Sequence, residues 1–100
     1  MLCNEGERCL ALLQEARAKL QQGHLVVLAI NPEILNQPNG AVFVNNLDEE
    51  QYLHYVAAIT LAIGPDSVTL RVFSWAAVYQ RTLRIRDLVT RFEGYISGEP

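Results

Sequence analysis

Two residues of this chain, Cys9 and His54, are the best suited by type to nucleophilic and acid–base chemistry. Histidine exchanges a proton near neutral pH, and a cysteine thiolate is a strong nucleophile. The pair could serve a thiol hydrolase or peptidase if the fold brought the sulfur within hydrogen-bond reach of the imidazole, about 3 Å. Simpler roles also fit the sequence. Cys9 would then be a small buried residue of a helix, and His54 a capping or surface residue near the acidic residues 48–50.

Other catalytic or ligand-binding patterns are weak. Cys3 and Cys9 lie six residues apart, and His24 and His54 are distant from them, so the four do not have the spacing of zinc ligands. The glycines are scattered and form no phosphate-binding loop. We therefore predict neither a metal nor a cofactor.

Three aromatic residues are the predicted binding contacts: Tyr52, Trp75 and Tyr79. Trp75 lies within residues 74–77, where an alternating strand pattern breaks, and Tyr79 follows that break. A bend or bulge at such a break can present a side chain to a partner. The alternative for Trp75 is a core anchor at the bend.

The chain has 100 residues, the size of one domain, which we assign to residues 1–100. Its net charge of -3 argues against nucleic acid as a partner, because phosphate binding needs a basic excess. No apolar run approaches the ~20 residues of a membrane span. The first residues lack the basic and apolar segments of a signal peptide. We therefore expect reduced cysteines and a cytoplasmic protein.

Charge is unevenly distributed along the chain. Lysine and arginine are absent between Leu20 and Leu70, whereas five arginines and one acid, Asp87, fall between Arg71 and Arg91. This split predicts a homo-oligomer in which an acidic patch of one copy meets a basic patch of another, an association that salt should weaken. The simpler explanation is two ordinary solvated faces.

The hydrophobic pattern predicts an α+β domain, with an N-terminal helix packed on a mainly antiparallel sheet of about five strands and a short C-terminal helix. The helices are expected at residues 4–22 and 86–95. The strands are expected at residues 24–30, 41–44, 52–63, 68–73 and 79–85. The last three strands should form an antiparallel meander. The long apolar run 52–64 should be buried on both faces.

Four stretches carry a resemblance to a known family: KLQQGHLVV at residues 19–27, HYVAAI at 54–59, VFSWA at 72–76 and FEGYI at 92–96. In their order and spacing they resemble the second half of a papain-like cysteine peptidase. The nearest type is the bacterial peptidases that trim double-glycine leaders, together with their inactive relatives. In that family a histidine opens an apolar strand, as His54 does here. An Asp or Asn at the end of the next strand orients the histidine.

The chain also departs from that family. Phe73 stands at the expected orienting position and cannot hold an imidazole tautomer. By this resemblance Cys9 lies in a different helix from the family's nucleophile, and Cys3 lies before that helix. The resemblance therefore implies a non-catalytic protein- or peptide-binding or regulatory module. The uneven charge adds the expectation that this module self-associates. The alternatives are a small cysteine hydrolase or peptidase using Cys9 and His54, and a structural interaction protein of unrelated α+β fold.

Overall fold

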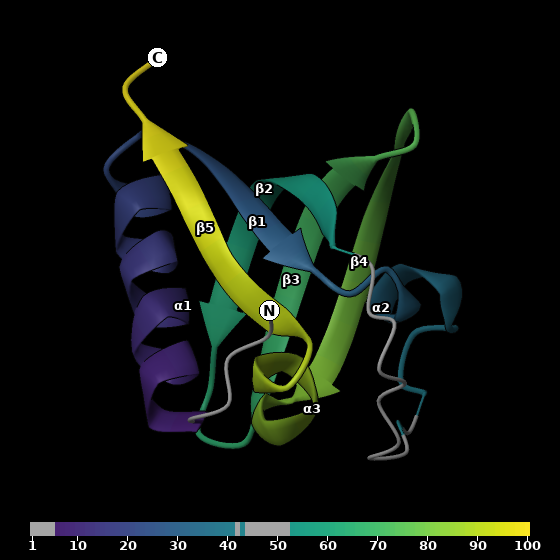
Figure 1. Cartoon of the computed structure of the whole chain (residues 1–100). Helices are drawn as coiled ribbons and strands as arrows, with labels where there is room; N and C mark the ends of the chain where they lie inside the picture. Colours follow the sequence, from purple (N-terminus) through teal and green to yellow (C-terminus); the bar gives the residue numbers. More distant parts are fainter. Residues whose placement is uncertain (1–5, 42, 44–52) are drawn as a thin grey trace.

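The computed structural model describes residues 6–41, 43 and 53–100, and over these residues it contains three helices and five strands (Figure 1). In chain order the elements are α1 (Gly6–Gln21), β1 (Leu25–Ile30), α2 (Glu33–Asn36), β2 (His54–Ile63), β3 (Ser67–Ser74), β4 (Ala77–Arg84), α3 (Ile85–Val89) and β5 (Phe92–Gly98). The α+β class predicted from the sequence is confirmed. None of the described helices is long and apolar enough to cross a membrane.

The five strands form one antiparallel sheet in the order β4-β3-β2-β1-β5. Consecutive strands β2, β3 and β4 are neighbours, so the predicted meander is confirmed. The last strand, β5, pairs with the first, β1, so the first and last strands of the sequence lie side by side in the sheet (Figure 1).

Helix α1 covers one face of the sheet. Its residues Cys9, Leu13 and Ala16 are fully buried at a spacing of three or four, as an amphipathic helix requires. They join one core cluster with residues from the helix side of the strands: Val26, Leu28, Ile30, Val56, Val68, Leu70, Val72 and Phe92. Figure 1 shows α1 along one side of the sheet with α3 near its first turns.

Gly23 ends α1 in the left-handed conformation that glycine adopts without Cβ strain, with φ at 84°. The amide of His24 donates to the carbonyl of Lys19 at 3.1 Å, and the amide of Gly23 donates to the carbonyl of Leu20 at 3.0 Å. This is the Schellman pattern, which satisfies the last helical carbonyls and turns the chain directly into β1.

The predicted C-terminal helix is wrong in its second half. Helix α3 ends at Val89, and Phe92–Gly98 is strand β5 rather than helix. The apolar residues of 88–96 match a helical spacing, but the backbone of β1 needs hydrogen-bond partners on its outer side, and β5 supplies them. Two of the four residues of the predicted strand 41–44 lie outside the described residues, and neither of the other two, Ala41 and Phe43, is in a strand.

The prediction that residues 52–64 are buried on both faces is also wrong. In β2, Val56 and Leu61 are buried, whereas Tyr55, Ala57 and Ala62 are exposed. The described helices lie on one face of the sheet, so no second layer formed by the described residues covers the other face of β2. Strand β2 therefore has the apolar composition of a strand that is buried on both faces, although the described residues cover only one of its faces.

Residues Trp75 and Ala76 form a two-residue hairpin turn between β3 and β4, where the sequence predicts a bend or bulge. Both have positive φ, 47° and 58°. Two left-handed residues between paired Ser74 and Ala77 make a type I′ turn, which normally carries Asn-Gly. An L-residue with a Cβ pays roughly 1–2 kcal/mol for this conformation.

We therefore expect Ala76→Gly to raise the free energy of unfolding by about 0.5–1 kcal/mol, because glycine removes the Cβ strain but adds entropy to the unfolded chain. Ala77→Gly is the matched control, since Ala77 is a strand residue and its replacement should destabilise by about 0.5–1 kcal/mol. Urea unfolding monitored by circular dichroism measures both. Equal destabilisation by the two variants would contradict the strained turn.

Candidate binding site

His54 and Ser74 are brought to the same end of the sheet by its register. His54 is the first residue of β2 and pairs with Ile30, the last of β1. Ser74 is the last residue of β3, and it alternates with the core residues Val72 and Leu70, so its side chain lies on the helix-covered face. Both side chains therefore meet at the edge of the core.

The imidazole of His54 has two contacts. Its Nε2 lies 2.5 Å from the Oγ of Ser74. Its ring stacks on the indole of Trp75, with centroids 4.3 Å apart and planes inclined by 22°. The serine hydroxyl can donate to or accept from the imidazole and carries no charge. The contact fixes the ring's position without the ionic partner found in a catalytic triad.

Tyr79 and Arg81 extend this group along β4. The ring of Tyr79 meets Trp75 edge to face at 5.9 Å, and the guanidinium of Arg81 lies 5.5 Å from the Tyr79 centroid. Arg81 in turn donates to the carbonyls of Gln37 at 3.1 Å and Leu35 at 3.0 Å, which fastens the end of α2 against β4. We call His54, Ser74, Trp75 and Tyr79 the His54 cluster.

The predicted site residues are partly brought together. Trp75 and Tyr79 touch each other, and Trp75 touches His54. Trp75 is 52% exposed, so it is a presented side chain and not the core anchor that was the alternative. Cys9 is fully buried in the core under α1. Tyr52 lies outside the described residues.

Ser74 is the residue that sequence reasoning missed. The resemblance pointed to Phe73 as the residue in the orienting position, but Phe73 is half exposed on the opposite face of the sheet. The alternation of Val68, Leu70 and Val72 could have shown this, because Ser74 continues that series and Phe73 does not.

Comparison with protein-family models, with curated proteins and with solved structures finds no match to this chain. Its functional assignment therefore depends on its own residues. Within the described part of the chain, no group of three or more His, Cys, Asp or Glu residues is placed to hold a metal ion.

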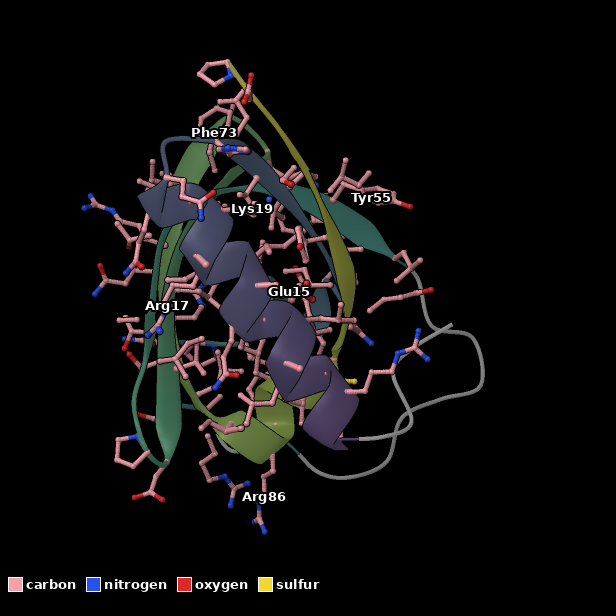
Figure 2. All side chains as sticks on the ribbon, turned by 90° about the vertical axis from the view of Figure 1, so that its left-hand side faces the viewer. Glu15, Arg17, Lys19, Tyr55, Phe73 and Arg86 are labelled. Carbon is pink, nitrogen blue, oxygen red and sulfur yellow. The ribbon has the colours of Figure 1, made fainter. Side chains whose placement is uncertain are left out.

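The second feature is the sheet face away from α1, which we call the open face. Five large apolar residues on it are 50–66% exposed: Leu25, Tyr55, Phe73, Val78 and Ile96. Figure 2, with α1 toward the viewer, shows Tyr55 and Phe73 on strands beyond the helix. Scattered exposed apolar residues are ordinary in soluble proteins, but a contiguous group of this kind marks an interaction surface.

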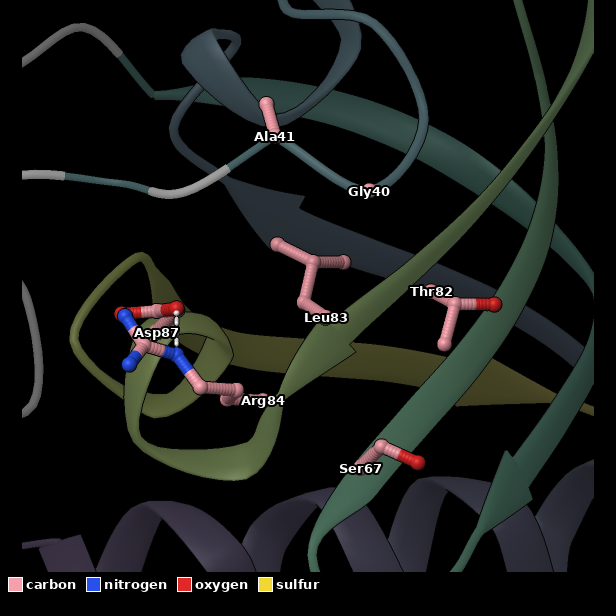
Figure 3. A pocket seen from close by; sticks show the side chains of 7 residues that line it. All are labelled: Gly40, Ala41, Ser67, Thr82, Leu83, Arg84 and Asp87. Carbon is pink, nitrogen blue, oxygen red and sulfur yellow. Dashed lines mark hydrogen bonds and ion pairs between the residues drawn. The ribbon is translucent and has the colours of Figure 1, made fainter.

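A pocket of about 260 Å³ lies between the Gly40–Ala41 segment and the junction of β4 with α3 (Figure 3). Its walls include the ion pair of Arg84 Nε with Asp87 Oδ2, 2.7 Å apart. The other carboxylate oxygen of Asp87 has no hydrogen-bond partner, but it is closed off from solvent. A ligand could not reach that oxygen without movement of the walls.

Proposed function

We propose that the chain is a non-catalytic, papain-like module that binds a protein or peptide partner at the His54 cluster and associates with itself. The observation that carries the proposal is the half-exposed Trp75 ring stacked on His54. An aromatic ring already fixed by a neighbouring ring loses little entropy on binding, and such rings are the common energetic anchors of protein interfaces.

The surroundings of His54 support the proposed absence of catalysis. Its partner is the hydroxyl of Ser74, where a catalytic imidazole is normally oriented by a carboxylate or amide. The candidate nucleophile Cys9 is fully buried in the core, and a reactive thiol needs access to substrate. A role as a small thiol hydrolase using Cys9 and His54 remains the alternative. A cytoplasmic location remains a prediction from the sequence.

The chain contains one tryptophan, so its fluorescence reports directly on Trp75. We expect a peptide ending in a double glycine, the ligand type suggested by the resemblance, to shift this emission in a saturable manner. The same peptide should be recovered uncleaved by mass spectrometry. Isothermal titration calorimetry should show that Trp75→Ala weakens binding by about 10-fold or more, as loss of an aromatic anchor does.

Phe73→Ala is the matched control, because Phe73 is exposed to the same extent, 50% against 52%, but lies outside the His54 cluster. It should change the peptide affinity by less than about 2-fold. Equal losses in the two variants would contradict binding at the cluster. Cleavage that disappears in His54→Ala would replace the binding proposal with an enzymatic one, and a parallel loss in Ser74→Ala would assign the hydroxyl to that reaction.

A further inference from the structure

The apolar residues of the open face form a continuous row across all five strands. The register pairs Val78 with Phe73, Phe73 with Ala57, Ala57 with Val27, and Val27 with Ile96. Each of these residues alternates with a core residue of its own strand, so all five point away from α1. We call this the central row.

Two neighbouring rows extend the apolar area. Tyr55 pairs with Ala29, and Ala29 with Gly94, on one side of the central row. Leu25 pairs with Gly98 on the other. The ten positions of the three rows, each covering about 4.8 Å between strands and about 6.6 Å along a strand, give roughly 300 Å² in projection. That is within the range of about 300–600 Å² for the largest apolar patch of a typical monomer, a patch that is often functional.

The rest of the face is polar. Beyond the apolar rows, β2, β3 and β4 present uncharged polar side chains and two arginines. The uncharged residues are Thr60, Thr69, Gln80 and Thr82, and the arginines are Arg71 and Arg84, of which Arg84 is paired with Asp87. Thr69 and Thr82 share a hydrogen bond of 2.9 Å across the strands. An apolar centre beside a polar rim that contains arginine is the usual anatomy of a protein–protein interface.

We infer that the open face is the contact surface between two copies of this chain, packed sheet on sheet about a two-fold axis near Ala57. The inference builds on the proposed self-association and names its surface. It replaces the association of charged patches that the sequence suggested, because Arg81, Arg84 and Arg91 are engaged within the chain by backbone carbonyls, Asp87 and Glu33.

The area of the face is compatible with a dimer. The apolar rows and the polar rim together cover roughly 600 Å² in projection. The accessible area of a surface of side chains is larger than its projection, and a standard interface needs about 800 Å² from each partner. A peptide segment would cover one or two rows only, whereas a second copy covers the face.

The shape and charge of the face also suit a second copy. Ala57, Ala29 and Gly94 form a low strip flanked by large residues, Phe73 on one side and Ile96 on the other, so large residues of one copy can enter the low strip of the other. Arg71 lies two residues from Phe73 along β3. A two-fold axis that lies between the sheets and crosses the strands near Ala57 therefore separates the two Arg71 backbone positions by about 13 Å, which is beyond the screening length of about 8 Å at physiological salt.

The exposed edge of β4 is less suited to dimerisation by strand-to-strand pairing than the open face is to packing. The α2 segment already occupies part of this edge, because the Thr82 amide donates to Asn39 Oδ1 at 2.8 Å and Arg81 binds the carbonyls of Leu35 and Gln37. The edge of β5 is the remaining alternative for strand-to-strand association.

Sedimentation equilibrium of the full chain and two variants tests the surface. The wild-type chain should form a dimer of twice 11.2 kDa. Ala57→Glu puts two carboxylates near the axis in an apolar centre, so it should weaken dimerisation by about 100-fold or more. Ala62→Glu is the matched control, the same change at an exposed position of the same strand and face but outside the apolar rows, and should change the dimer constant by less than about 3-fold.

Phe73→Ala supplies a second variant in case Ala57→Glu fails to fold, which circular dichroism would reveal; it should weaken dimerisation by about 10-fold or more. A dimer that Ala57→Glu and Phe73→Ala leave intact would overturn the open face as its surface while leaving self-association standing. That result would point to the edge of β5. A wild-type chain that stays monomeric at all concentrations would overturn both the self-association and the open face as its contact surface.

Discussion

Replacing Phe92 by alanine should lower the free energy of unfolding by about 3–5 kcal/mol. Phe92 is fully buried in the core cluster, where β5 begins and closes against α1 and α3. Removing its ring leaves a cavity that the neighbouring strand backbones cannot fill. Urea unfolding at a concentration where the chain is monomeric measures the change.

The matched variant is Phe73→Ala, the same substitution on the opposite face of the sheet. Phe73 is half exposed, and no described residue of the same copy forms a layer above it. Its loss should therefore cost less than about 1 kcal/mol. Similar losses for the two phenylalanines would mean that the open face is covered within a single copy.

The second large effect is expected at Arg91, a fully buried arginine. Its Nε pairs with Glu33 Oε2 at 3.3 Å, its Nη1 donates to the Asp87 carbonyl at 3.0 Å, and its guanidinium lies 4.5 Å from the Phe43 ring centroid. It thereby joins α2, α3 and Phe43 at one point. Arg91→Ala should destabilise by about 3–5 kcal/mol, because it removes the charge pair and the packing together.

Arg91→Met separates these two contributions, since methionine fills most of the volume without the charge. Because the Glu33 carboxylate that remains is one third exposed (34%) and can be solvated without Arg91, we expect this variant to recover more than half of the loss. Arg86→Ala, at an exposed position of α3, is the control and should change stability by less than about 0.5 kcal/mol. A thermal or urea melt of all three variants decides the matter. A methionine variant as unstable as the alanine variant would show that the polar contacts, and not the packing, hold this point.

Local patterns predicted much of the fold. The stripe of α1, the left-handed Gly23 and the alternation of β3 follow from periodicity and from the conformational freedom of glycine, and the structure contains them. Strand β5 could not be predicted this way, because its residues take their conformation from pairing with β1, which lies some seventy residues earlier in the chain.

The candidate site was predicted in its residue types but not in its contacts. His54, Trp75 and Tyr79 were chosen from their positions at strand ends and at a break in pattern. Their mutual stacking depends on a two-residue turn formed by Trp75 and Ala76, residues that seldom adopt positive φ. The alternation of β3 places Ser74, and not Phe73, beside His54.

The open face shows the limit of composition as a guide. The run containing β2 is apolar on both faces, and apolarity alone predicts that both faces are covered. Composition does not say whether the covering layer comes from the same chain. In the described chain it comes from α1 on one face only, and the second layer is what we assign to another copy.

The most direct test of this account is sedimentation equilibrium of the wild-type chain at about 50 mM and about 500 mM sodium chloride. Contact through an apolar face predicts a dimer whose dissociation constant stays the same or falls at the higher salt concentration, because salt does not screen apolar burial. A dimer that dissociates as salt rises would instead indicate contact between charged patches. Such a result, or a monomer at both concentrations, would contradict the assignment of the open face.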